Sequence, residues 1–283
     1  MFKRKMLLIP ILVFLFTCLV GCNNTDKPID NPKDKVGTAT SYGLVNKTYV
    51  GAATVKVKND KIEDVTYDEA FLPNTWAALN YTHEEGKELP DEVLHHLKND
   101  QSSYYAKYIS IDGKVFTGTI RENDLVIDEY TYVNQVVNYK SDTIDDLFSY
   151  LYKSEENAKW YYEAVKNSKA FICNKNGEKV ESLPLLNDVG WFKSEGKYWP
   201  QSQTNPLGWK GNIDNLVEYL KGKTLTDLDS TKFMQDEVGE DKDGYNYKYW
   251  TIDGVKTKVT MSDIYNYYKL AYNAYSKAKQ NAK

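Results

Sequence analysis

The sequence predicts an α+β fold in which antiparallel sheets pack against helices and form two related halves. Three observations carry this prediction. Segments of alternating apolar residues, typical of strands, flank short Asn-Asp and Asp-Gly turns. Longer segments carry apolar residues at helical spacing. One stretch in the middle of the chain also aligns without a gap with a stretch near the C-terminus.

The first strands are predicted directly after a polar N-terminal region. Residues 47–60 alternate through Val55 and Val57, and residues 60–70 continue the alternation through Ile62 and Val65. Asn59-Asp60 between them is a typical two-residue hairpin turn. An antiparallel hairpin therefore opens the folded body.

The middle of the chain mixes helix and strand signals. A helix is predicted from Pro90, because proline suits a first helical turn and acidic residues follow it. Residues 114–120 and 125–133 are rich in β-formers and predict two strands, with a turn at residues 122–124.

Three further segments predict helices. Residues 141–167 carry an apolar stripe and have Ser141 or Asp142 as the N-cap. Residues 211–223 predict a shorter helix, with Asn212 as its N-cap and Gly222 as its stop.

The third of these helices, residues 262–280, closes the chain. It follows a Ser262 cap, and lysines gather at its C-terminal end, where the helix dipole favours them.

An internal repeat relates two hairpins. Residues 104–120 align with residues 245–261, which places Asp112-Gly113 on Asp253-Gly254 and Thr119 on Thr260. The alternative is that two Asp-Gly hairpins have converged on similar β-formers.

If the repeat is real, the chain has a boundary near residues 166–169. The two related halves are then residues 42–167 and 168–283.

The N-terminus has the pattern of a secretory signal. Lys3, Arg4 and Lys5 precede an apolar run, Met6–Val20, that is short for a bilayer span of roughly 20 residues. Leu19–Cys22, "LVGC", resembles a bacterial lipobox, which implies removal of residues 1–21 and lipid on Cys22. The alternative is a plain membrane anchor with a chance cysteine.

Residues 22–41 are polar and rich in Asn, Asp, Lys and Pro, and they predict a flexible tether. Composition favours a low-GC Gram-positive source. The protein is therefore expected on the outer face of the plasma membrane, attached through the lipid at Cys22.

Charge and cysteine content limit the function classes. Without Lys3, Arg4 and Lys5, 33 basic residues remain against 40 acidic ones, a net charge near −7. This balance argues against nucleic-acid partners. Cys173 is the one cysteine left after processing and lipidation, so no internal disulfide is expected, and its apolar surroundings predict an inert buried thiol.

No metal or hydrolase motif is present. The adjacent His95 and His96 cannot share an ion at helical spacing, and a solvated face is the better interpretation. The loop at residues 190–212 carries Trp191, Trp199 and Trp209. Either these rings pin the loop to the core, or they form an aromatic wall for a planar ring or a sugar.

Both ends of the folded body resemble FMN-binding domains. Tyr49-Val50-Gly51 and Lys61–Val65 match that family's opening strands, and residues 251–278 resemble its closing segment. In the family an Asp-Gly stretch leads to a Ser/Thr-Gly-Ala-Thr motif and an Ala-rich helix. The resemblance implies covalent FMN, joined to the last Thr by a flavin transferase, and electron transfer in a lipoprotein of the pheromone-lipoprotein type.

By position, Thr257 takes the first place of this motif and Thr260 the last, while Lys258 and Val259 stand where Gly and Ala are expected. Lys258 and Val259 favour plain strand. Thr260 is therefore the predicted attachment residue, Thr119 the second choice, and Asp253-Gly254 the turn that places the strand.

The resemblance implies an electron carrier rather than an enzyme, with a flavin transferase and a membrane electron donor as partners. The alternative is a flavin-free lipoprotein that holds a solute, a glycan or a protein partner on its aromatic loop. A separate hypothesis concerns residues 14–21, "FLFTCLVG", which have the apolar character of a pheromone peptide released from a signal sequence.

Overall fold

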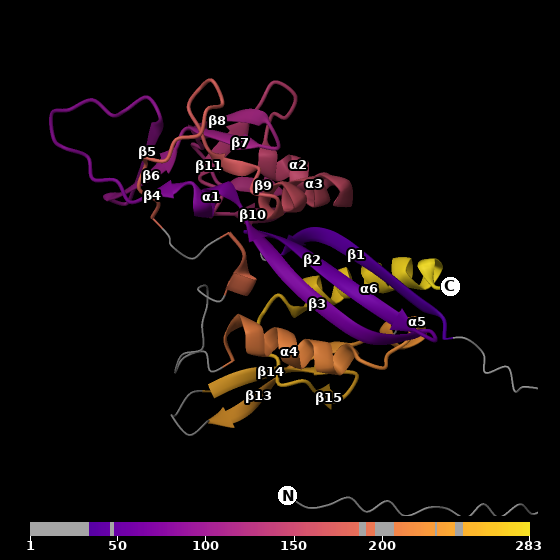
Figure 1. Ribbon diagram of the computed structural model, residues 1–283. Helices are drawn as coiled ribbons and strands as arrows, with labels where there is room; N and C mark the ends of the chain where they lie inside the picture. Colours follow the sequence, from indigo (N-terminus) through magenta and orange to yellow (C-terminus); the bar gives the residue numbers. More distant parts are fainter. Residues whose placement is uncertain (1–33, 46–47, 187–190, 196–206, 230, 241–245) are drawn as a thin grey trace, which may run out of the picture. The chain divides into compact units, whose positions relative to one another are not determined.

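The computed structural model describes residues 34–45, 48–186, 191–195, 207–229, 231–240 and 246–283 (Figure 1). Every described residue belongs to one compact unit, Asp34–Lys283. The predicted signal peptide and Cys22 lie outside the described residues. The α+β prediction is confirmed, with 28% of residues in helices and 38% in strands.

An antiparallel sheet of order β1-β2-β3 opens the folded body. Its strands are β1 (Val36–Val45), β2 (Tyr49–Lys58) and β3 (Lys61–Phe71). Asn59 and Asp60 take positive φ values of 51° and 62°, as the predicted hairpin turn requires. Because β1 begins at Val36, residues 36–41, predicted as the end of the tether, are strand instead.

A second sheet has the order β11-β8-β7-β12. Its strands are β7 (Tyr108–Ile111), β8 (Lys114–Ile120), β11 (Val137–Lys140) and β12 (Ala170–Ile172). β12 follows the predicted boundary at residues 167 and 168, yet pairs with β7, which precedes that boundary. The relation between the two halves stays a prediction.

The predicted helix at Pro90 is wrong. This region forms a sheet of order β4-β6-β5, from β4 (Ala78–Leu79), β5 (Val93–Lys98) and β6 (Gln101–Ala106). Asn99 and Asp100, with φ values of 51° and 60°, form a two-residue hairpin turn. The turn at Asp128-Glu129 likewise divides the predicted strand 125–133 into β9 (Leu125–Ile127) and β10 (Tyr130–Tyr132).

The helix predicted over residues 141–167 is divided at Ser154, whose backbone is extended. A short helix α1 (Pro73–Trp76) lies earlier in the chain, and the divided segment forms α2 (Leu147–Lys153) and α3 (Glu155–Lys166). The side chain of Asp146 caps α2, so Ser141 and Asp142 are not its caps. The Ser154 side chain caps α3 by accepting a hydrogen bond from Asn157 N at 3.2 Å.

The described residues after β12 form four helical segments and a three-stranded sheet of order β13-β14-β15. The elements are η1 (Lys193–Glu195), α4 (Gly208–Leu220), α5 (Leu225–Asp229), β13 (Phe233–Glu240), β14 (Asn246–Ile252), β15 (Val255–Lys256) and α6 (Ile264–Asn281).

Two predicted caps in this region are wrong. Asn212 lies inside α4 rather than at its N-cap, and no side chain of a described residue, Ser262 included, caps α6. Gly222 follows the end of α4 with φ of +77°, as predicted.

The first sheet contributes side chains to two hydrophobic cores. Val50 and Phe71 pack in one core with α2, α3 and the second sheet. Val55 and Ile62 pack in the other with α4 and α6. The C-terminal helix α6, yellow in Figure 1, thus contacts strands formed by the first described residues. Among the described residues, no helix is long and apolar enough to cross a bilayer.

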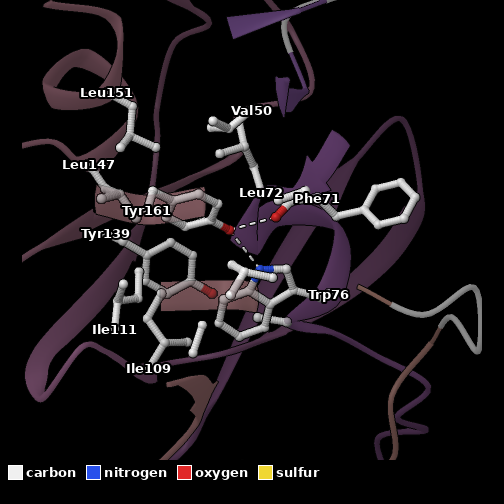
Figure 2. Close-up of a cluster of buried hydrophobic side chains, with 14 of the residues drawn as sticks. Val50, Phe71, Leu72, Trp76, Ile109, Ile111, Tyr139, Leu147, Leu151 and Tyr161 are labelled. Atoms are coloured by element: carbon white, nitrogen blue, oxygen red, sulfur yellow. Dashed lines mark hydrogen bonds between the residues drawn. The ribbon is translucent and has the colours of Figure 1, made fainter. Parts of the chain in front are cut away.

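Tyr161 is a buried polar link in the first core (Figure 2). Its hydroxyl donates to Phe71 O at 2.5 Å and accepts from Trp76 Nε1 at 2.9 Å.

Tyr161→Phe should lower the free energy of unfolding by about 1–3 kcal/mol, because two buried groups lose their partner. Urea unfolding measures the change. Tyr150→Phe, on a half-buried ring, is the control and should change it by less than about 0.5 kcal/mol. Equal losses in the two variants would contradict this account.

Candidate functional site

The motif segment, residues 257–260, lies between β15 and α6 and is not plain strand. The backbone carbonyl of Trp250 accepts a hydrogen bond from Thr257 N at 3.0 Å, and the backbone N–H of Trp250 donates one to Val259 O at 2.9 Å. The chain therefore bulges outward at Lys258, which takes a left-handed φ of 59°. The predicted strand is wrong here because both hydrogen bonds converge on Trp250.

Asn212 of α4 holds the turn that contains Thr260. Its Oδ1 accepts hydrogen bonds from Thr260 N at 2.7 Å, Thr260 Oγ1 at 3.2 Å and Met261 N at 3.3 Å. Its Nδ2 donates to Gly208 O at 2.7 Å, and the side chain is fully buried. Thr260 itself is half-buried. The sequence signal for this role is an amide beside the apolar stripe of an amphipathic helix.

The other two threonines have different surroundings. Thr257 is buried, and its hydroxyl donates to Trp250 O at 2.8 Å and accepts from Val259 N at 3.2 Å. Thr119 is exposed in β8, opposite Asn138. The structure therefore does not give Thr119 and Thr260 equivalent environments, although the Asp-Gly turns that precede them match in backbone conformation.

Asp253-Gly254 forms the predicted turn, with φ values of 51° and 77°. The carboxylate of Asp253 accepts from Lys232 N at 2.8 Å and from Tyr219 OH at 2.8 Å. Burial acts to raise the pKa of Asp253, but these hydrogen bonds, with one from Thr231, outweigh it and lower the pKa. Asp253 thus ties α4 to the start of β13, which is a structural role.

An aromatic cluster lies beside the motif. The indole of Trp250 donates to Met261 O at 2.8 Å, so its ring borders the turn. Phe233 contacts Trp250, Tyr265 and Tyr268, with ring centroids 6.4, 5.7 and 5.0 Å away. Tyr265, in the first turn of α6, is 59% exposed. Sequence reasoning missed this cluster because its members are far apart along the chain.

Two tryptophans of the segment 190–212 pack on the core, as the first of the two alternatives for this segment predicts. Trp191 packs on Trp76 with ring centroids 4.6 Å apart. Trp209 is buried, and its Nε1 donates to Glu69 Oε1 at 3.1 Å. Trp199 lies outside the described residues.

A buried ion pair joins β3 to η1. Glu69 and Lys193 are 2.7 Å apart, with side chains 0% and 3% exposed. Lys193 Nζ also lies 3.7 Å from the centre of the Tyr49 ring, a cation–π contact. Burial raises the pKa of Asp263, the residue before α6, and the charge of Lys193 partly opposes that shift.

The remaining reactive groups are structural or exposed. Cys173 is fully buried, and burial raises the pKa of its thiol to about 11, which keeps it protonated. His95 and His96 are adjacent on β5, so their side chains point to opposite faces of the sheet. Among the described residues, no group of three His, Cys, Asp or Glu side chains is arranged to hold a metal ion.

No protein-family model matches this chain, and neither a curated protein nor a solved structure matches it significantly.

Asn212→Ala should free the turn around Thr260. We expect the free energy of unfolding to fall by about 1–3 kcal/mol, because buried donors lose their acceptor. The amides of Thr260 and Met261 should also exchange hydrogen faster. Asn215→Ala is a control on the same helix, where one 3.4 Å bond to Lys258 O is lost. Unchanged exchange at Thr260 in Asn212→Ala would contradict this role.

Asp263→Asn should change how stability depends on pH. When folding raises the pKa of a carboxyl group, the folded protein becomes less stable as the pH rises from the unfolded pKa, about 3.9, through the folded pKa. The free energy of unfolding of the variant should therefore increase relative to that of the parent as the pH rises from about 3 to about 7, a range that begins below the unfolded pKa. Urea unfolding across this range measures the gain, and a pH-independent difference would show that Asp263 has no raised pKa.

Proposed function

We propose that this chain is an extracytoplasmic lipoprotein, anchored through lipid on Cys22, that carries FMN covalently on Thr260 and relays electrons. Its attachment partner would be a flavin transferase, and its electron source a donor in the membrane. The alternative is a flavin-free lipoprotein that binds a solute, a glycan or a protein partner.

The backbone of Lys258 is the observation that carries the proposal. Lysine stands where the related motif has glycine, yet its φ of 59° is the left-handed conformation that glycine adopts readily. The chain therefore has the turn that a glycine in the motif would permit, despite the different side chain. The buried Val259 side chain anchors the turn, and the half-buried Thr260 follows it.

The surroundings of Thr260 fit most parts of an FMN group. The first backbone N–H group of α6, at Ile264, follows four residues later, and no side chain of a described residue caps this helix, which suits a phosphate. Trp250 and the exposed Tyr265 offer rings beside the turn for an isoalloxazine. The negative charge of the Asp263 carboxylate would repel the phosphate.

The attachment step uses the Thr260 hydroxyl as the nucleophile. Thr260 Oγ1 would attack the flavin-side phosphorus of a flavin dinucleotide, so that a phosphoester bond forms, the pyrophosphate bond breaks, AMP leaves and the hydroxyl proton passes to solvent. The hydroxyl gives up its bond to Asn212, while Thr260 N and Met261 N keep theirs. Once bound, the flavin would supply the redox chemistry.

The test is co-expression of the full chain with a flavin transferase. The purified protein should absorb visible light as a flavoprotein, and its intact mass should rise by one FMN less one water. Thr260→Ala should abolish both changes because the nucleophile is gone.

Matched variants locate the attachment residue. Thr260→Ser keeps a hydroxyl and should still gain flavin, and the exposed Thr119→Ala should leave attachment unchanged. Asp263→Asn should raise the extent of attachment by removing the opposing charge. A colourless parent without added mass would refute the proposal and leave the flavin-free alternative, whereas flavin on Thr260→Ala would show that the site is elsewhere.

A further inference from the structure

A cavity of about 610 Å³ lies between β5 and the end of β8. One wall is His95–Lys98 of β5, and the other combines residues 120–124 with Val133, Gln135 and Val136. This volume is within the range of small-ligand and peptide sites, roughly 300–1,000 Å³. The motif around Thr260 contributes nothing to it.

The wall formed by β5 is an open strand edge. In the order β4-β6-β5, β5 has a strand partner on one side only. Because the hairpin has a two-residue turn, Lys98 and Gln101 form a hydrogen-bonded pair. Hydrogen-bonded and non-hydrogen-bonded pairs then alternate along the two strands, so His95 and Leu97 are in non-hydrogen-bonded pairs. The N–H and C=O groups of His95 and Leu97 therefore point away from β6, and no described residue bonds them.

The opposite wall presents a cation with an unused donor. Arg121 continues from β8, and its N–H bonds to Val136 O at 2.9 Å. One guanidinium nitrogen pairs with Asp146, while the buried Nε has no hydrogen-bond partner among the described residues. The Arg121 side chain is 14% exposed.

Exposed apolar side chains flank the same cavity. Leu97 is 60% exposed and Val133 is 54% exposed. Large aliphatic side chains exposed together beside an open edge indicate a surface that another chain covers.

We propose that this cavity binds an extended acidic peptide segment, which adds to β5 as a strand and places a carboxylate beside Arg121. Alternating free backbone donors and acceptors are the chemistry that recognises an extended polypeptide. Residues 122–124 stand across from the edge, so a single strand fits there more readily than the sheet of a second copy. Arg121 selects a carboxylate because its guanidinium donors match that group.

The probe is a phage-displayed library of random seven-residue peptides, selected on the full chain and followed by calorimetry on the synthetic peptides. Selected peptides should carry an acidic residue among alternating apolar ones. Replacing that acid by its amide should weaken binding at least tenfold. The Arg121→Gln variant should bind the acidic peptide and its amide analogue with equal affinity.

Leu97→Pro tests the strand edge directly. Proline removes the outward N–H of Leu97 and leaves the ladder to β6 intact, and peptide affinity should fall at least tenfold. Leu97→Thr keeps that N–H and loses only the apolar side chain, so it should weaken binding less than Leu97→Pro.

N-methylated peptides give a test that does not depend on how the variants fold. Methylation should abolish binding at alternate peptide positions only, because every second N–H faces β5. The proposal is overturned if no peptide is enriched, if methylation acts without this alternation, or if free glutamate competes as well as the peptide. It is also overturned if the chain instead dimerises through β5. None of these readouts depends on flavin.

Discussion

The buried ion pair between Glu69 and Lys193 is the contact on which the arrangement around the motif depends. Glu69 is on β3 and Lys193 is on η1, far apart in the sequence. Trp209 of α4 donates to Glu69 and also to Tyr267 OH of α6, at 3.1 and 3.2 Å. One carboxylate thus connects four elements. Removing one partner of such a pair costs roughly 3–5 kcal/mol, because the other charge stays buried without compensation.

A second constraint is that the first sheet serves two cores. Some buried side chains of β1–β3 pack with α2 and α3, while others pack with α4 and α6. Ser41 on β1 donates to Leu270 O of α6 at 2.5 Å, a contact across 229 positions. A contact between residues so far apart in the sequence requires a large loop to close, and this costs conformational entropy before the contact stabilises the chain. The second core therefore forms only when the C-terminal helix docks. The motif at residues 257–260 lies directly before that helix.

Local signals predicted much of the fold. The turns at Asn59-Asp60 and Asp253-Gly254 are as predicted, because a left-handed conformation depends on residue type at the turn itself. The prediction at Pro90 was wrong because a proline followed by acidic residues resembles a helix start, whereas Asn99-Asp100 forms a hairpin turn of the kind recognised correctly at Asn59-Asp60. The break at Ser154 was missed because two helices with compatible stripes resemble a single one.

The candidate site was predictable only in part. Sequence position alone identified Thr260 and the lysine in the place of a glycine. By itself the sequence determined the fold class, most turns and the expectation of a lipid anchor, since all of these depend on neighbouring residues. Only the tertiary structure decided that Lys258 bulges, that Asn212 holds Thr260, that Thr257 is buried, and that Trp191 and Trp209 pack on the core. The bulge at Lys258 and the burial of Thr257 depend on hydrogen bonds to Trp250 of the neighbouring strand, and the other two depend on contacts between distant segments. Such tertiary contacts override local preference.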